Sequence, residues 1–344
     1  MWLPDSSLDH LREIAEQPDF SQTKYRLLST LGRGGMGSVY RAQDQELGRE
    51  VALKVISDPD PGPEAAERLR REARILARLE HPGIVPVHDV GTLGDGRLYY
   101  AMKRVRGRRL DEHLKDHSPP LPQRLRIFER ICEAVAFAHA HGVIHRDLKP
   151  ANIMVGAFGE VLVMDWGVAK IRRRLPAGEP AEAPPDGEGG DGVRGDGTPG
   201  EGAAETAVPL EGAGPETAHG TILGTPGYMA PEQARGEVGA IDERTDVFAL
   251  GSLLGFLLSS AGEAPVPLRA VIEKARAAEP SERYAGATEL AAEIGRYLAG
   301  LAVGAYRETL LQRLGRFYRR YRAAILLVLA YLLMRVLVFW LFGY

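Results

Sequence analysis

The sequence of 344 residues is poor in cysteine and in net charge. Cys132 is its single cysteine, which excludes an intramolecular disulfide and is typical of a reducing compartment. The 43 Lys and Arg nearly balance the 46 Asp and Glu, so charge gives no reason to expect nucleic acid as a partner. Residues 1–24 contain several acidic side chains and no apolar run, so we expect no secretory leader there.

Large apolar side chains are nearly missing from residues 171–220, where Gly, Pro, Ala and acidic residues dominate. Such a segment cannot bury enough surface to offset its ordering entropy, so we predict that it is disordered. The chain as a whole is 44% hydrophobic, which is ample for a large core elsewhere.

Two kinds of secondary structure follow each other along the rest of the chain. Up to about residue 105 the pattern predicts strands, including Val51–Ile56, Ile84–Val90 and Arg97–Met102, with one helix at Glu64–Leu79. After that the pattern is helical, most clearly over Gln123–His141. This predicts an α+β fold in which a small β-rich lobe precedes a larger helical lobe.

A glycine-rich run at Gly32–Gly37 (GRGGMG) is the first motif that suggests chemistry. A dinucleotide-binding turn has the same spacing but must open a helix, whereas the β-prone run Ser38–Ala42 follows here. We therefore predict a turn between two strands whose backbone amides approach phosphate oxygens. A merely flexible hairpin is the alternative. The glycines concerned are Gly32, Gly34, Gly35 and Gly37.

Lys54 ends a strand that the pattern predicts to be buried, so its charge needs a partner. Glu72, on the following predicted helix, can supply it. Lysine is a compact charge suited to the phosphates of a nucleotide, and a glutamate behind it would fix its position. A surface lysine and a solvated glutamate are the alternative reading.

The run His145–Asn152 (HRDLKPAN) resembles the catalytic loop of a protein kinase. The lysine after the leucine is the form typical of Ser/Thr kinases, and the resemblance, to the bacterial eukaryotic-like Ser/Thr kinases, covers residues 25–300. It implies that Asp147 accepts or orients the proton of the substrate hydroxyl. It further implies that Lys149 steadies the transferring phosphoryl group and that Asn152 ligates one Mg²⁺.

Asp165–Gly167 (DWG) stands where the family usually has Asp-Phe-Gly. The resemblance gives Asp165 a role in binding Mg²⁺, since a hard cation that bridges phosphates needs a carboxylate. The larger Trp166 departs from the pattern and could alter the balance of active and inactive states. The resemblance also stacks Leu76, Val87, His145 and Trp166 into one apolar column through both lobes.

Gly224–Glu232 resembles the end of a kinase activation segment. By this resemblance Thr225 bonds to the catalytic loop, Glu232 pairs with Arg283, and Asp246 anchors the catalytic-loop backbone. Two threonines just upstream are candidates for autophosphorylation, and a phosphate there could pair with Arg146. These two threonines are Thr217 and Thr221.

The resemblance also assigns the ATP site by position. The residues that would sandwich the adenine ring are Leu31, Val39, Ala52 and Met154. Met102 would lie at the back of the pocket, and Lys103–Val105 would offer backbone hydrogen bonds. In the C-terminal part, Ser252–Ser260 is followed almost at once by Pro267–Ala278, so a loop and a helix usual in the family are expected to be missing.

Residues 323–342 are almost entirely apolar and are about long enough to cross a bilayer as a helix. Arginines precede them within 301–322, where we expect a basic helix, and this flank predicts that the kinase lies on the cytoplasmic side. Arg335 lies inside the run and could snorkel or pair in an oligomer, which leaves a homodimer open. A hydrophobic helix docked on the soluble domain is the alternative. Almost nothing follows the span, so we expect signals to arrive from the cytoplasm, from lipid or from a partner membrane protein.

These observations predict a bilobal protein-kinase-like fold with a C-terminal transmembrane helix. The expected parts are a lead (1–24), a kinase domain (25–300, divided at 105/106), a basic helix (301–322) and a span (323–342). The expected activity is transfer of the γ-phosphate of ATP, with Mg²⁺, to Ser/Thr hydroxyls of protein substrates at a lipid bilayer. A pseudokinase scaffold is the rival, but all six polar residues of the site are present. They are Lys54, Glu72, Asp147, Lys149, Asn152 and Asp165.

Overall fold

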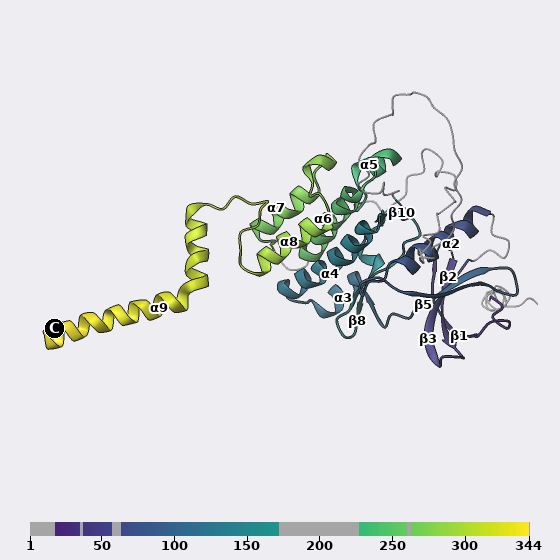
Figure 1. Ribbon diagram of the computed structural model, residues 1–344, viewed down its shortest axis with the longest axis horizontal. Coiled ribbons are helices and arrows are strands. Elements are labelled where there is room, and N and C mark those ends of the chain that lie inside the picture. The colour runs from purple at the N-terminus through teal and green to yellow at the C-terminus, as the bar shows by residue number, and fades with distance from the viewer. Residues whose placement is uncertain (1–17, 35–36, 57–62, 172–226, 260–262, 344) are drawn as a thin grey trace, which may run out of the picture. The chain divides into compact units, whose positions relative to one another are not determined.

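The computed structural model describes residues 18–34, 37–56, 63–171, 227–259 and 263–343 (Figure 1). Within the predicted disordered segment 171–220, residue 171 ends strand β10, and the remaining residues lie outside the described part of the chain. Gly35, Thr217, Thr221 and Thr225 also lie outside it.

An antiparallel five-stranded sheet forms the first lobe, with strand order β1-β2-β3-β5-β4. Its strands are β1 (Tyr25–Gly34), β2 (Gly37–Asp44), β3 (Arg49–Val55), β4 (Val87–Thr92) and β5 (Leu98–Lys103). Gly34 pairs with Gly37, so the glycine-rich run joins two strands, as predicted. A β-carbon on Gly37 would lie 2.3 Å from the carbonyl oxygen of Val55, so no larger residue fits there without a shift of the backbone.

The two faces of this sheet pack against different clusters because side chains alternate along a strand. On β5, Tyr100 belongs to the large core that runs into the second lobe, whereas Tyr99 belongs to a smaller outer cluster. That outer cluster also contains Phe20, whose ring meets Tyr40 edge-on. The lobe therefore includes part of the predicted lead 1–24, which Phe20 ties to the sheet.

Helix α2 (Pro63–Arg78) covers the inner side of the first lobe and begins at a proline, which is favourable in the first turn of a helix (Figure 1). Leu69, Ala73 and Leu76 recur at helical spacing and are all buried in the large core. Glu72 lies on the same face and is also buried. The periodicity that predicted a helix at Glu64–Leu79 therefore also brought Glu72 to the core.

The second lobe is mainly helical and contains two small sheets. Its strands are β6 (Gly107–Arg109), β7 (Val143–Ile144), β8 (Ile153–Gly156), β9 (Val161–Val163) and β10 (Lys170–Ile171). Its helices are α3 (Leu110–His117), α4 (Leu121–Ala140), α5 (Pro231–Ala234), α6 (Glu243–Ser259), α7 (Val266–Ala275) and α8 (Ala287–Leu298). Short 3₁₀ turns lie at Pro150–Asn152, Val238–Ala240 and Pro280–Glu282. Helix α4 matches the predicted helix Gln123–His141 to within two residues.

Helix α6 is the central helix of this lobe, because its own side chains are buried on nearly every side of the helix. Gly251 allows α7 to approach closely, since a β-carbon there would lie 2.7 Å from that of Ala275. Helix α6 ends at Ser259 and α7 begins at Val266. This connection is too short for a further helix, in agreement with the shortening predicted from the sequence.

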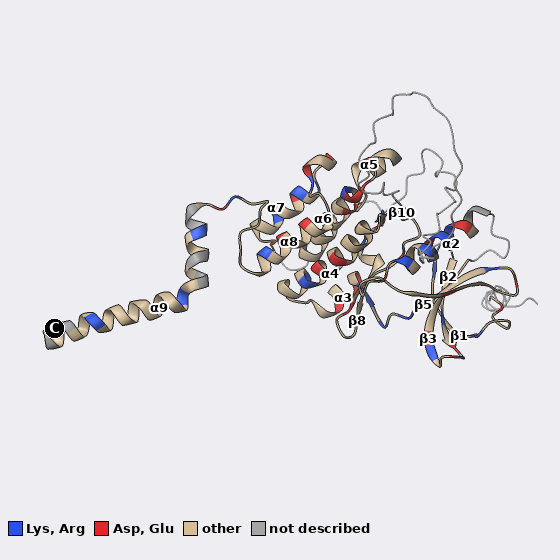
Figure 2. Cartoon of the chain, viewed as in Figure 1, with Lys and Arg blue, Asp and Glu red and all other residues tan. Residues whose placement is uncertain are grey.

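The chain after α8 differs from the predicted basic helix at 301–322. Val303 is buried against the core, and Glu293 accepts a hydrogen bond of 3.1 Å from the backbone of Ala305. These contacts hold the segment in a non-helical form, so the helix, α9 (Leu310–Phe342), begins only at Leu310. Its stretch Tyr321–Val338 has a mean hydropathy of 2.0 and is not buried, and it carries few charged residues (Figure 2).

Candidate active site

Lys54 and Glu72 meet at the junction of β3 and α2. The Lys54 Nζ donates to both carboxylate oxygens of Glu72, at 2.7 and 2.8 Å. Only 14% of the Lys54 side chain and 3% of the Glu72 side chain are exposed, so each charge needs the other. Burial alone would lower the pKa of Lys54, but the carboxylates of Glu72 and Asp165 outweigh it and raise this pKa. Lys54 is therefore a fixed cation.

Tyr100 completes this pair and was not predicted from the sequence. Its hydroxyl donates to Glu72 Oε1 at 2.9 Å, and its side chain is almost fully buried. Burial, followed by the nearby Glu72 carboxylate, raises the pKa of Tyr100 well above its ordinary value, so the hydroxyl keeps its proton. A tyrosine on a buried strand is most often simply core. Here the pairing of β3 with β5 places Tyr100 opposite Lys54, the partner of Glu72.

The catalytic-loop residues form a second hydrogen-bonded group around Asp147. Lys149 Nζ donates to Asp147 Oδ2 at 2.6 Å. Asn152 Nδ2 donates to the backbone carbonyl of Asp147 at 2.8 Å and to its Oδ2 at 3.1 Å. The 3₁₀ turn that begins at Pro150 brings Asn152 back to Asp147. The carboxylate is therefore fixed in direction by two neighbours from its own loop.

Asp246 on α6 anchors the backbone of this loop, as the resemblance implied. Its carboxylate accepts hydrogen bonds from the amides of His145 at 2.8 Å and Arg146 at 2.9 Å. Arg146 has a φ of 72°, in the left-handed region that costs a non-glycine residue about 1–3 kcal/mol. Burial disfavours the Asp246 charge, but His139, 2.8 Å away, and the backbone donors hold its pKa below the ordinary value. His139 was not predicted from the sequence.

Asp165 contacts the first of these groups and is influenced by the charge of Lys149 in the second. Its Oδ1 lies 3.3 Å from Lys54 Nζ, and its φ of 58° is again in the left-handed region. Burial would raise the pKa of Asp165, but Lys54, with smaller contributions from His145 and Lys149, lowers it. Gly167 leaves room for this arrangement, because a β-carbon there would lie 3.2 Å from Glu72 Oε2.

Trp166, the unusual residue of the DWG run, is 1% exposed. Its ring lies 4.6 Å from that of His145, and its Nε1 donates to the Val163 carbonyl at 3.3 Å. Leu76 belongs to the same core, against which Val87 packs. The core thus accommodates the larger ring and supplies a partner for its N–H.

Asn152 and Asp165 have the donor chemistry that Mg²⁺ prefers. The Asn152 amide nitrogen is engaged with Asp147, and the amide oxygen makes no hydrogen bond within the described residues. The Asp165 side chain is 53% exposed and contacts Lys54 through one oxygen. Among the described residues no three His, Cys, Asp or Glu side chains form a metal cage. Mg²⁺ commonly binds one or two protein ligands together with substrate phosphates.

The residues assigned to the adenine site lie on four strands of the first lobe and one of the second. Ala52 and Met102 are directly paired on β3 and β5, and both are buried. Val39 packs against the same core, whereas Leu31 on β1 is 50% exposed. Met154 lies on β8, partly exposed.

Glu232 and Arg283 form a buried ion pair, as the resemblance implied, with distances of 2.7 and 2.8 Å. Burial opposes the Glu232 charge, but hydrogen bonds from Arg283 and Thr245 hold its pKa below the ordinary value. Gln233, next in the chain, donates to the Arg146 carbonyl at 2.9 Å. The described end of the activation segment is thereby tied to the catalytic loop.

Comparison with known proteins agrees with this geometry. Residues 25–178 match the protein kinase domain. Serine/threonine-protein kinase PknD of Chlamydia muridarum is 32% identical over 316 residues, which cover 80% of this chain and 32% of PknD. PknD of Chlamydia caviae is 34% identical over 316 residues, with 80% and 31% coverage. The chain therefore spans about a third of the length of these curated relatives.

Solved structures give the same answer for the fold. The PknI kinase domain of Mycobacterium tuberculosis superposes with a TM-score of 0.53 at 25% identity, covering 81% of this chain and 97% of that domain. A second structure of the same domain gives a TM-score of 0.51 at 26% identity. The β-rich first lobe and the helical second lobe of this chain, together with its sequence relatives, place it among the bacterial eukaryotic-like Ser/Thr protein kinases.

Proposed function

We propose that this chain is an ATP-dependent protein kinase that transfers the γ-phosphate of ATP to Ser and Thr hydroxyls of protein substrates. One observation carries the proposal. Two hydrogen-bonded groups, Glu72–Lys54 and Lys149–Asp147–Asn152, come from distant parts of the sequence. Asp165 contacts Lys54 of the first group at 3.3 Å and is influenced by the charge of Lys149 in the second. A scaffold that only bound partners would have no need for this convergence.

In this proposal each polar group has one task. The glycine-rich turn covers the phosphates, and Lys54, held by Glu72, contacts the α- and β-phosphates. Asp147 accepts the proton of the substrate hydroxyl, with its carboxylate oriented by Asn152. Lys149 compensates the charge that develops on the transferring group, in an arrangement set before the substrate arrives.

Asn152 and Asp165 would hold the Mg²⁺ ion in this proposal. When bound, Mg²⁺ would supply positive charge that offsets the negative charge developing on the phosphates. Lys54 lowers the pKa of Asp165 against the opposing effect of burial, so the carboxylate stays charged in the site. The aliphatic residues at Leu31, Val39, Ala52, Met102 and Met154 would enclose the adenine ring.

Transfer of labelled phosphate tests the proposal directly. The full chain in detergent is incubated with ATP, Mg²⁺ and a generic Ser/Thr acceptor, beside Lys54→Met and Asp147→Asn variants. We expect the wild-type chain to transfer phosphate and each variant to lose at least about a hundredfold in rate. ATP binding by the wild type without any transfer would identify a pseudokinase scaffold instead.

We also propose that α9 anchors the kinase domain at the cytoplasmic side of a membrane. Residues 323–342 contain thirteen Leu, Ile, Val or Phe residues, which contribute roughly 4–8 kcal/mol to insertion. Arg335 opposes insertion by about 2.5–3.5 kcal/mol at the bilayer centre, so insertion remains favourable. The full chain should stay with membranes after an alkaline carbonate wash. Release into the supernatant would contradict the anchor.

Autophosphorylation of Thr217 or Thr221 is part of the same proposal. It is supported by Arg146, whose Nε is buried without a hydrogen-bond partner in the described residues. Burial and the nearby Arg71 lower the pKa of Arg146, and Asp246 opposes them. A phosphate beside Arg146 would therefore stabilise its buried positive charge. Phosphosite mapping that finds both threonines bare in active protein would contradict it.

A further inference from the structure

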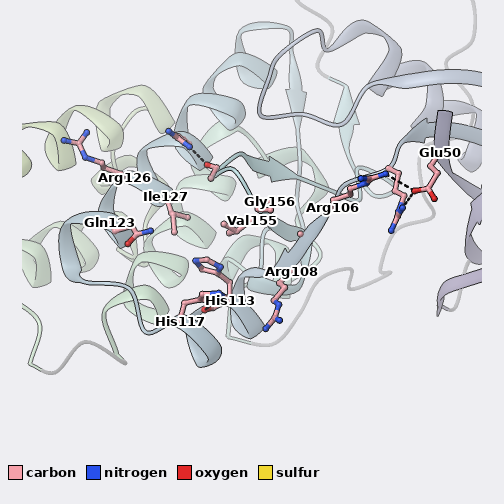
Figure 3. A pocket seen from close by; sticks show the side chains of 15 residues that line it. Glu50, Arg106, Arg108, His113, His117, Gln123, Arg126, Ile127, Val155 and Gly156 are labelled. Carbon is pink, nitrogen blue, oxygen red and sulfur yellow. Dashed lines mark hydrogen bonds and ion pairs between the residues drawn. The ribbon is translucent and has the colours of Figure 1, made fainter. Parts of the chain in front are cut away.

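A groove lined by five arginines lies outside the residues of phosphate transfer. It encloses about 910 Å³ between the segment after β5, helices α3 and α4, and the turn between β8 and β9 (Figure 3). Glu50 is the one acidic residue among those that line it. The arginines that line it are Arg104, Arg106, Arg108, Arg126 and Arg130.

The groove and the proposed adenine site lie on opposite faces of one small sheet. Val155 lines the groove, and its neighbour Met154 on β8 is assigned to the adenine site. Successive side chains of a strand point to opposite faces. Arg108, which is paired with Val155 across the β6–β8 ladder, lines the groove as well. A ligand in the groove would therefore not compete with ATP.

Positive charge in the groove exceeds the negative charge that compensates it. Glu50 is shared by three arginines, with Arg41 and Arg106 each at 3.2 Å and Arg104 in direct contact. Burial, together with repulsion from Arg41 and Arg106, lowers the pKa of Arg104. One carboxylate thus faces three guanidinium groups, which leaves two positive charges uncompensated at this end.

Two of the other three arginines of the groove have a carboxylate nearby. Arg108 pairs with Asp116, and Arg126 interacts with the charge of Glu129. Arg130 donates to the backbone carbonyl of Gly159, which carries no charge. The carboxylates of Asp116, Glu129 and Glu160 lie beside the groove but do not line it, so arginines outnumber acidic residues along the lining itself.

The groove is long rather than round. The labelled side chains run from Glu50 and Arg106 past Val155 and Gly156 to Ile127, Gln123 and Arg126 (Figure 3). Its volume is at the upper end of small-molecule pockets, and far larger than one phosphate ion needs. Apolar and small residues lie between the charged ends, so a flat lipid surface would leave the groove unfilled. An extended chain with several carboxylates matches both its length and its charge.

We propose that this groove docks an acidic, extended segment of the protein substrates of this kinase, an inference that rests on the proposed function. Arginine presents a planar fork that bonds both oxygens of a carboxylate, and it is enriched at protein interfaces. Docking here raises the local concentration of the acceptor hydroxyl at the active site, on the other side of the β6–β8–β9 sheet.

The test uses binding and turnover on the full chain in neutral detergent. The probe for binding is a fluorescent hexaglutamate peptide without Ser or Thr, measured by anisotropy, with a hexaglutamine peptide beside it. The variant is Arg106→Gln with Arg126→Gln, two exposed groove residues outside the catalytic groups. The matched control is Arg26→Gln with Arg70→Gln, two exposed arginines outside the groove.

We expect the hexaglutamate peptide to bind better than hexaglutamine and to lose roughly tenfold in affinity in the groove variant, but not in the control. With a Ser/Thr peptide joined to hexaglutamate, KM should rise by a similar factor in the groove variant while kcat stays unchanged. Equal binding of the two peptides, or equal loss in both variants, would overturn the proposal. So would a groove variant that loses only binding to phosphatidylserine vesicles. Because anisotropy needs no turnover, failure of phosphate transfer would be recognised separately.

Discussion

Replacing Tyr100 with Phe should weaken the active site while leaving the fold in place. The change removes one hydroxyl, which donates to Glu72 at 2.9 Å, and keeps the buried ring. A hydrogen bond to a charged group contributes about 1.5–3 kcal/mol. Glu72 keeps its two contacts with Lys54, so the lower end of that range applies. Since 1.4 kcal/mol is a factor of ten, we expect kcat/KM to fall about tenfold.

The assay is steady-state phosphorylation of a Ser/Thr peptide at varied ATP, together with thermal unfolding. Tyr99→Phe is the matched control, because it makes the same chemical change one residue away on the opposite face of β5. Its kcat/KM should match that of the wild type. If Tyr100→Phe has unchanged kinetics, or if both variants lose the same activity, then Tyr100 does not position Glu72 and belongs only to the core.

Two further predictions concern the architecture. Arg283→Met should destabilise the protein by about 3–5 kcal/mol in denaturant unfolding, because it leaves the buried Glu232 carboxylate without its cation; Arg235→Met, which breaks an exposed pair with Glu237, should cost less than about 1 kcal/mol. If the two variants lose the same free energy of unfolding, the buried Glu232–Arg283 pair does not stabilise the fold more than an exposed pair does. The pKa of Asp246 is depressed in the folded state, so the unfolded chain takes up the proton first as the pH falls. The stabilisation of the folded state by the Asp246 carboxylate is thus complete above its ordinary pKa of 3.8 and is lost as the pH falls through its lower folded pKa. Asp246→Asn should therefore flatten the fall in unfolding free energy with pH over this acidic window. An unchanged slope would contradict the assignment.

The local elements and the motifs could be predicted from the sequence. Helix α4 and the glycine-rich turn between two strands follow from periodicity and from the β-prone residues after the glycines. The catalytic loop, the DWG run and the partners Glu72 and Asp246 could be named because their residue types and order carry the kinase resemblance. Element ends were less accurate: the predicted helix at 301–322 begins only at Leu310, since packing of Val303 holds the chain before it.

Only the tertiary structure brings in Tyr100, His139, Gln233 and the arginine groove. Each depends on contacts between residues far apart in the chain, such as the 28 residues that separate Glu72 from Tyr100 and the 107 that separate His139 from Asp246. Local sequence determines backbone preference and which side of an element faces the core. Which side chains then meet across elements is decided by strand pairing and helix packing, and with it the charge that each surface presents.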